Sequence, residues 1–366
     1  MSQVFGSCSR YTQGYGELNN LDKHTSWMGN NYLIVASKNR LRDLQDQITT
    51  ALEGATLNFI QFDGECSWEE IHKLEDIVKE YGSEIILGIG GGKVADTTKV
   101  VAHTTGAKLV IIPTTAASDA YTSAASLIYK DGEVEDVMNF PKSPELVLVD
   151  TEVLIKSPVR LFVSGMGDAL STYIGGKICF DNSYDNHFNA KATHTGLNIG
   201  KLSYDLLFEY GRQAKEAAVN KSITKAYNTI VEVNILMSGL GFENSGSSSD
   251  HSFYFGTLAL PDREEYVYHG EGVAFSICCL LVLTGASTEE IDKIYKFLVD
   301  VGLPVTFDDM HLFDLTEEEM DIMTKSTLSQ PFFHNQPFEI DYAMVYGAYK
   351  TADAIGKIYK AGGSIL

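Results

Sequence analysis

Short apolar runs alternate with amphipathic stretches over the first part of the chain. The runs predict buried strands at Tyr32–Ala36, Leu57–Phe62, Ile85–Ile89, Leu109–Pro113 and Leu146–Asp150, and a short edge strand at Arg10–Gly14. Apolar residues at helical spacing between these runs predict helices over 41–52, 71–81 and 94–102. Strands that alternate with helices in this way are typical of a parallel α/β sheet wound with right-handed crossovers.

The strand pattern ends near Pro158, and helical patterns follow to the C-terminus. They predict helices over 165–179, 194–210, 214–240, 270–283, 288–301, 316–326 and 342–359. A chain of 366 residues usually forms two domains. We therefore predict an α/β domain over residues 1–160 and an all-helical domain over 161–366.

Three consecutive glycines separate one of the predicted strands from the helix after it. The stretch reads Gly90, Gly91, Gly92, Lys93, Val94, Ala95, Asp96. Glycine lets the backbone approach a ligand closely, and a helix N-terminus carries partial positive charge. We therefore predict a phosphate-binding loop, although the spacing matches neither G-x-G-x-x-G nor G-x-x-x-x-G-K-[ST]. A tight strand-to-helix turn without a ligand is the alternative.

A second polar segment follows the strand Leu109–Pro113. It contains Thr114, Thr115, Ala116, Ala117, Ser118 and Asp119. Open parallel sheets bind ligands at the carboxyl ends of their strands, so this segment is a candidate binding loop. An ordinary Ser/Thr loop with a capping aspartate is the alternative.

One carboxylate and two imidazoles form a candidate metal-ligand set in the second half of the chain. Asp168 is expected at the start of a helix, His251 after a glycine- and serine-rich turn, and His269 at the start of another helix. These donors suit Zn²⁺ or Fe²⁺ acting on a bound oxygen. The spacing alone also fits a helix-capping aspartate and two histidines at helix ends.

Charge and cysteine content narrow the class of protein. The formal net charge of −21 argues against nucleic acid or an anionic membrane as a partner. The five cysteines show no C-x-x-C spacing, which fits a reducing compartment. No signal-peptide pattern is visible at the N-terminus, and the longest apolar run, near 274–283, is too short to span a bilayer. We expect a cytoplasmic enzyme.

Six blocks, in order, resemble the glycerol dehydrogenases of the iron-containing (group III) alcohol dehydrogenase superfamily. They are Gly90–Asp96, Pro113–Tyr129, Leu146–Thr151, Gly167–Leu170, Ser238–Glu243 and Tyr268–Phe275. The resemblance covers nearly the whole chain. It implies a Rossmann-like dinucleotide-binding domain, a helical domain, an active site in the cleft between them, and a homo-oligomer.

The resemblance also implies roles for individual residues. The expected metal ligands are Asp168, His251 and His269. The expected substrate contacts are Asp119, the candidate catalytic residue, and Tyr254. The expected NAD or NADP contacts are Ser37, Gly90, Gly91, Gly92, Lys93, Val94, Ala95, Asp96, Thr114, Thr115, Ala116, Ala117, Ser123, Ala125 and Tyr129.

Three positions depart from the family pattern. Ser37, followed by Lys38 and Arg40, stands where an acidic residue usually binds the adenosine ribose and selects NAD. A serine beside cations would accept the 2′-phosphate of NADP. Tyr254 stands where a further histidine is usual, and Gly272 where a lysine is common.

The sequence therefore predicts a metal-dependent, NAD(P)-linked oxidoreductase that interconverts a small polyol and its ketone. One alternative on the same scaffold is an NADPH-dependent 2-oxo-acid reductase. A lyase similar to dehydroquinate synthase is a second alternative, but the first ligand of that family is a glutamate, whereas this chain has Asp168. A non-enzymatic protein on a decayed scaffold is the third, and the complete ligand set argues against it.

Overall fold

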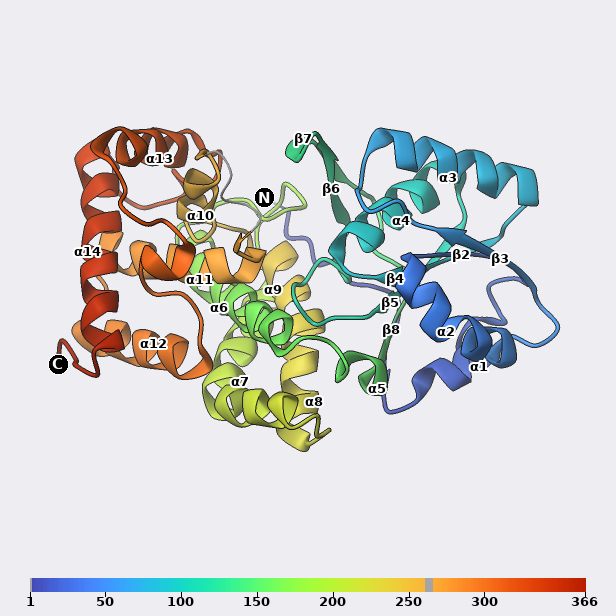
Figure 1. The fold of residues 1–366 in the computed structure, drawn as a ribbon. Helices are drawn as coiled ribbons and strands as arrows, with labels where there is room; N and C mark the ends of the chain where they lie inside the picture. The colour runs from blue at the N-terminus through green and yellow to red at the C-terminus, as the bar shows by residue number, and fades with distance from the viewer. Residues whose placement is uncertain (1, 261–265) are drawn as a thin grey trace. The chain divides into compact units, whose positions relative to one another are not determined.

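The computed structural model describes residues 2–260 and 266–366, which form two compact units. The sheet unit comprises Gly6–Pro158 with Lys221–Ile223. The helical unit comprises Val159–Asn220 and the described residues of Thr224–Leu366, together with residues 2–5. Figure 1 shows the strands of the first unit and the helices of the second.

A six-stranded parallel sheet forms the centre of the sheet unit. Its strands are β1 (Tyr11–Gly14), β2 (Asn31–Ala36), β3 (Thr56–Gln61), β4 (Ile85–Gly90), β5 (Lys108–Pro113) and β8 (Leu146–Asp150). They lie in the order β1-β8-β5-β4-β2-β3, and every neighbouring pair is parallel. The predicted fold class, a parallel sheet followed by a helical part, is confirmed.

Helices cover both faces of this sheet. They are η1 (Glu17–Asn20), α1 (Leu21–Thr25), α2 (Lys38–Ala51), α3 (Trp68–Tyr81), α4 (Gly92–Thr105) and α5 (Thr151–Leu154). Ile34 and Leu87 share a buried apolar cluster with Ile48 of α2. Gly88 faces the other way, where an added Cβ would lie 2.4 Å from the Thr98 hydroxyl of α4. Because strand residues alternate between faces, α2 and α4 cover opposite sides (Figure 1).

A two-stranded antiparallel ribbon was not predicted. It consists of β6 (Ala125–Lys130) and β7 (Glu133–Asn139). The apolar pattern missed it because β7 carries three acidic residues and no continuous apolar run. The dipeptide Asp131-Gly132 was the available signal, since both residues have positive φ (52° and 86°), as two-residue hairpin turns require.

Helices make up the helical unit. They are α6 (Val159–Asp181), α7 (His194–Val219), α8 (Lys225–Glu232), the π-helical turn η2 (Val233–Met237), α9 (Ser238–Ser245), α10 (Ser252–Thr257), α11 (His269–Leu283), α12 (Thr288–Val301), the short 3₁₀ helix η4 (Asp308–Met310), α13 (Glu317–Ser329) and α14 (Tyr342–Lys360). None of the helices in the described ranges combines the length and apolar character needed to cross a bilayer.

The single helix predicted over 214–240 is wrong. Instead, α7 ends at Val219, and Lys221 adopts a left-handed conformation with φ of 51°. Thr224 then caps the next helix, because its side chain accepts a hydrogen bond from the Tyr227 amide at 3.2 Å. The apolar spacing continues through this turn, so periodicity alone could not locate the break.

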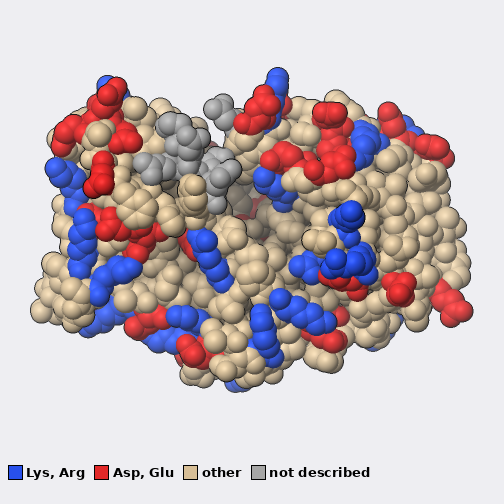
Figure 2. Space-filling model, viewed as in Figure 1, with Lys and Arg blue, Asp and Glu red and all other residues tan. Residues whose placement is uncertain are grey.

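Acidic and basic side chains are interspersed on the face shown in Figure 2. The described residues of that face form no continuous basic patch.

Candidate metal centre and cofactor loop

The parallel register brings three predicted segments together at the carboxyl ends of the strands. Ala36 of β2 pairs with Ile89 of β4, and Gly90 pairs with Pro113 of β5. Ser37, the glycine loop and Thr114 therefore follow neighbouring strands. The strand order also reverses between β2 and β4, because β3 lies on the far side of β2. Open α/β sheets bind ligands at such a switch point.

The glycine loop leaves the first turn of α4 open. Gly91 occupies the N-cap position with φ −87° and ψ −167°, and it brings no side chain to cap the helix. A Cβ at Gly91 would meet nothing within 4 Å. In contrast, a Cβ at Gly90 would lie 2.6 Å from the Val94 side chain. Gly90 is thus needed for packing, whereas Gly91 exposes backbone amides to any ligand at the helix N-terminus.

The segment after β5 borders this loop. The Thr114 amide donates to the Gly90 carbonyl at 3.0 Å. A Cβ at Gly92 would lie 3.7 Å from the Ala120 side chain, so the half-buried loop that carries Asp119 passes close to the glycines.

Thr115 is fixed by a 2.9 Å hydrogen bond to the Tyr121 hydroxyl. Lys93 lies over the Tyr129 ring, 5.3 Å from its centroid.

A buried ion pair within α4 contacts the segment that precedes and begins β6. Lys99 Nζ lies 3.1 Å from Asp96 Oδ1 and 3.1 Å from Ser123 Oγ, and donates to the Ala125 carbonyl at 2.7 Å. Burial raises the pKa of Asp96, and the Lys99 ammonium opposes that shift. Lys99 was not predicted from the sequence. Its signal was the spacing of Asp96 and Lys99, which places both side chains on one face of a helix.

The three candidate metal ligands converge in the helical unit. Asp168 lies in the interior of α6, His251 is the N-cap residue of α10, and His269 is the first residue of α11. The prediction that Asp168 begins a helix is wrong, which also removes the capping alternative. Its neighbour Gly167 allows close helix packing instead, because a Cβ there would lie 2.1 Å from the Gly270 carbonyl of α11.

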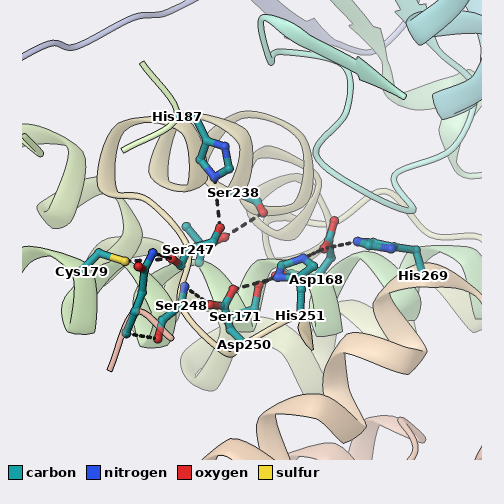
Figure 3. Close-up of polar contacts among 12 residues, drawn as sticks. Asp168, Ser171, Cys179, His187, Ser238, Ser247, Ser248, Asp250, His251 and His269 are labelled. Atoms are coloured by element: carbon teal, nitrogen blue, oxygen red, sulfur yellow. Dashed lines mark hydrogen bonds and ion pairs between the residues drawn. The ribbon is translucent and has the colours of Figure 1, made fainter. Parts of the chain in front are cut away.

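Both imidazoles point toward one oxygen of the same carboxylate (Figure 3). His269 Nε2 lies 3.3 Å and His251 Nε2 3.6 Å from Asp168 Oδ1. One donor atom from each of the three residues lies within 4.8 Å of the others. Asp168 is only 2% exposed. Two nitrogens and a buried carboxylate oxygen at these separations fit Zn²⁺ or Fe²⁺.

The charges of this cluster also fit a cation. Burial alone would raise the pKa of Asp168, but the His269 and His251 rings hold it below its usual range. Burial alone would lower the pKa of His251, but bonds to Asp168 and Asp250 raise it above its usual range. The pocket therefore favours positive charge between the carboxylate and the rings, which a divalent ion would provide.

The comparisons with known proteins decide the family. The model of the iron-containing alcohol dehydrogenases matches residues 8–151. A glycerol dehydrogenase from Citrobacter freundii is 35% identical over 365 residues, covering 99% of this chain and 100% of the relative. The chain belongs to the iron-containing alcohol dehydrogenase family. It is a glycerol dehydrogenase-like member and an oxidoreductase of the alcohol and polyol dehydrogenase class.

Two further comparisons extend this result. A glycolaldehyde reductase from Halobacterium salinarum is 33% identical, covering 98% of this chain and 99% of the relative. The crystal structure of a probable glycerol dehydrogenase from Sinorhizobium meliloti is 33% identical, with a TM-score of 0.91, 97% of this chain covered and 99% of that chain.

Two of the three departures of this dehydrogenase from its family pattern, Tyr254 and Gly272, lie in contact with each other. A Cβ at Gly272 would lie 2.0 Å from the Tyr254 ring. The ring therefore occupies the space that any side chain at position 272 would need. The same ring lies edge-on to His269, with centroids 5.5 Å apart. The tyrosine and the glycine are thus one structural change beside the candidate metal centre.

The third departure leaves the turn after β2 without a carboxylate at position 37. Ser37 ends the strand at the N-cap of α2 but makes no capping hydrogen bond with its side chain. Lys38 is exposed, and Arg40 Nη1 lies 3.8 Å from Asp43 Oδ2. This turn therefore carries the Ser37 hydroxyl and two nearby cations, one of which, Arg40, is paired with Asp43.

Proposed function

We propose that this dehydrogenase interconverts a small polyol such as glycerol and its ketone, dihydroxyacetone, with NAD or NADP and one divalent metal ion. The observation that carries the proposal is the convergence of Asp168, His251 and His269. The glycerol dehydrogenases at about one-third identity over the whole chain support the polyol class.

The residues of the chain have separate tasks in this proposal. Asp168, His251 and His269 hold the metal through one oxygen and two nitrogens. The bound ion would supply Lewis acidity toward a substrate hydroxyl, and the nicotinamide would accept the hydride. Asp119 accepts a hydrogen bond from a second substrate hydroxyl, and Tyr254 contacts the substrate beside His269.

The sheet unit holds the dinucleotide at its switch point. The backbone amides at the start of α4, from Gly91 to Val94, bind the pyrophosphate. The segments after β5 and in β6 line the nicotinamide side, through Thr114–Ala117, Ser123, Ala125 and Tyr129. Lys99 and Asp96 keep these segments in place from the buried side.

Cofactor choice follows from the corner after β2. A carboxylate there would repel a 2′-phosphate, and Ser37 removes that repulsion. Lys38 and Arg40 add positive charge near the same position. We therefore propose that the enzyme uses NADP at least as well as NAD.

Reduction of a small hydroxyaldehyde is the second candidate activity. The relative that favours it is the glycolaldehyde reductase, which matches this chain over nearly its full length. The chemistry is the same hydride transfer in the reverse direction. The 2-oxo-acid reductase is not better supported by these relatives than the polyol dehydrogenase. We also propose that the chain is cytoplasmic and forms a homo-oligomer. Light scattering would measure the mass of this oligomer.

Metal-dependent turnover tests the proposal. The purified protein is stripped with a chelator, reloaded with Zn²⁺ or Fe²⁺, and assayed with glycerol, dihydroxyacetone, glycolaldehyde and a 2-oxo acid, each with both cofactors. We expect turnover of a polyol or its carbonyl product only after reloading, and none in His269→Ala. His194→Ala is the control, because His194 is exposed and outside the cluster. Full activity of His269→Ala with unchanged metal content would refute the ligand assignment.

A further inference from the structure

Asp250 is a buried carboxylate that directly precedes one of the proposed metal ligands. Its Oδ2 lies 2.8 Å from Nδ1 of His251. The residue is only 2% exposed. Figure 3 shows Asp250, His251 and Asp168 in a row, with the imidazole between the two carboxylates. Because a buried carboxylate is costly without hydrogen-bonding partners, the ring nitrogen of His251 is one of the groups that stabilise Asp250.

The loop that carries Asp250 is held rigidly by hydrogen bonds. The Ser248 amide donates to Asp250 Oδ1 at 2.6 Å. Ser248 Oγ donates to the Asn335 carbonyl at 2.6 Å, and Ser249 Oγ donates to the Phe333 carbonyl at 2.8 Å. The Gln336 amide donates to both serine hydroxyls, at 2.7 and 3.1 Å. One distant segment, residues 333–336, therefore anchors the loop that carries this carboxylate.

Helix α6 leaves room for this carboxylate. A Cβ at Gly175 would lie 2.1 Å from Asp250 Oδ1 and 2.4 Å from its Cγ. Gly175 follows Asp168 by about two helical turns, so both residues lie on the same side of α6. One face of one helix thus supplies a proposed metal ligand and the space for the carboxylate behind the second ligand.

We propose that Asp250 is a positioning residue that holds His251 in the tautomer with a proton on Nδ1, so that Nε2 presents its lone pair beside Asp168. This inference rests on the proposed metal centre. A hydrogen bond from the remote ring nitrogen to a carboxylate orients a ligating imidazole and makes it a stronger donor. Asp250 and Asp168 together also balance the charge of a divalent ion held by two neutral imidazoles.

Metal affinity of the apo-protein tests the role of Asp250. Co²⁺ and Zn²⁺ dissociation constants are measured by chelator competition for wild type, Asp250→Ala and Asp250→Asn. We expect Asp250→Ala to weaken binding by about 10–100-fold. Asp250→Asn keeps an acceptor oxygen and nearly the same shape, so it should fold and recover part of the loss. The visible spectrum of bound Co²⁺ should also change in Asp250→Ala, because His251 is no longer held in one orientation.

Two control variants distinguish a positioning role of Asp250 from a general loss of stability and from an error in the metal-ligand assignment. Asp353→Asn is the matched control, because Asp353 is a buried aspartate of the same unit that accepts from the Phe307 amide at 2.9 Å, away from the cluster. It should leave the dissociation constant unchanged. If folded Asp250→Asn and Asp250→Ala bind Co²⁺ within about twofold of wild type while His251→Ala loses binding, the role of Asp250 is refuted and the metal centre stands. If His251→Ala also binds normally, both fail.

Discussion

Replacement of Gly272 by alanine probes the packing beside the metal centre. The added Cβ would lie 2.0, 2.2 and 2.6 Å from three atoms of the Tyr254 ring. Contacts below 3.0 Å force a shift, and the ring is only 6% exposed, so it has little room to move. Overpacking of a buried site costs about 1–3 kcal/mol, and three such contacts favour the upper end. Alanine recovers about 1 kcal/mol through helix propensity. We expect Gly272→Ala to destabilise the helical unit by about 2 kcal/mol.

Gly347→Ala is the matched control for this substitution. Gly347 lies in the interior of α14, and a Cβ there would meet nothing within 4 Å. The alanine should therefore stabilise the unit by up to about 1 kcal/mol. Removal of the Tyr254 ring should likewise make the substitution Gly272→Ala stabilising. In a Tyr254→Ala background, Gly272→Ala should stabilise by up to about 1 kcal/mol, which gives a coupling energy of about 3 kcal/mol.

Urea unfolding followed by far-ultraviolet circular dichroism measures these changes. Trp27 and Trp68 both belong to the sheet unit, so tryptophan fluorescence would not follow the helical unit. The metal content of Gly272→Ala should fall as well, because the displaced ring presses on His269. The packing account is refuted if Gly272→Ala stabilises the protein as Gly347→Ala does, or if the cycle shows no coupling.

Three further predictions concern the cofactor loop, cofactor choice and pH. Gly91→Ala should keep wild-type stability but weaken dinucleotide binding in a fluorescence titration, whereas Gly90→Ala should lower the melting temperature because it meets Val94. Ser37→Asp should shift the ratio of kcat/KM values toward NADH by about a hundredfold or more, since close like charges cost on the order of a few kcal/mol; a wild type that uses only NADH would contradict this. Burial lowers the pKa of His187 to about 4. Because the unfolded state then binds the proton first, stability should fall as the pH drops from about 6.5 toward 4, and less so in His187→Gln, as urea midpoints would show.

The sequence by itself determined the strands of the parallel sheet and the glycine turn between β4 and α4. Apolar runs such as Ile85–Ile89 are buried on both faces of a parallel sheet, so they are visible without any knowledge of their neighbours. Consecutive glycines weaken helix and strand alike, so the triplet indicates the point where β4 ends and α4 begins. The ribbon β6–β7 was not recognised in this way, because its strand β7 is acidic and carries no continuous apolar run.

Only the tertiary structure decided which distant residues meet. The strand order places Ser37, Gly91 and Thr114 side by side, and no local pattern records that order. Asp168 was expected at the start of a helix, yet its neighbour Gly167 lies inside α6 and permits the crossing of α6 and α11. A glycine required by a neighbouring helix looks the same in the sequence as one required by a turn.

The role of Asp250 illustrates the same limit. In the sequence it is one polar residue among serines, and nothing nearby indicates burial. Its space comes from Gly175, and its loop is anchored by Gln336. Burial and hydrogen-bond partners are properties of the folded chain, so a carboxylate that acts through a ligand can be recognised only after the fold has brought its partners together.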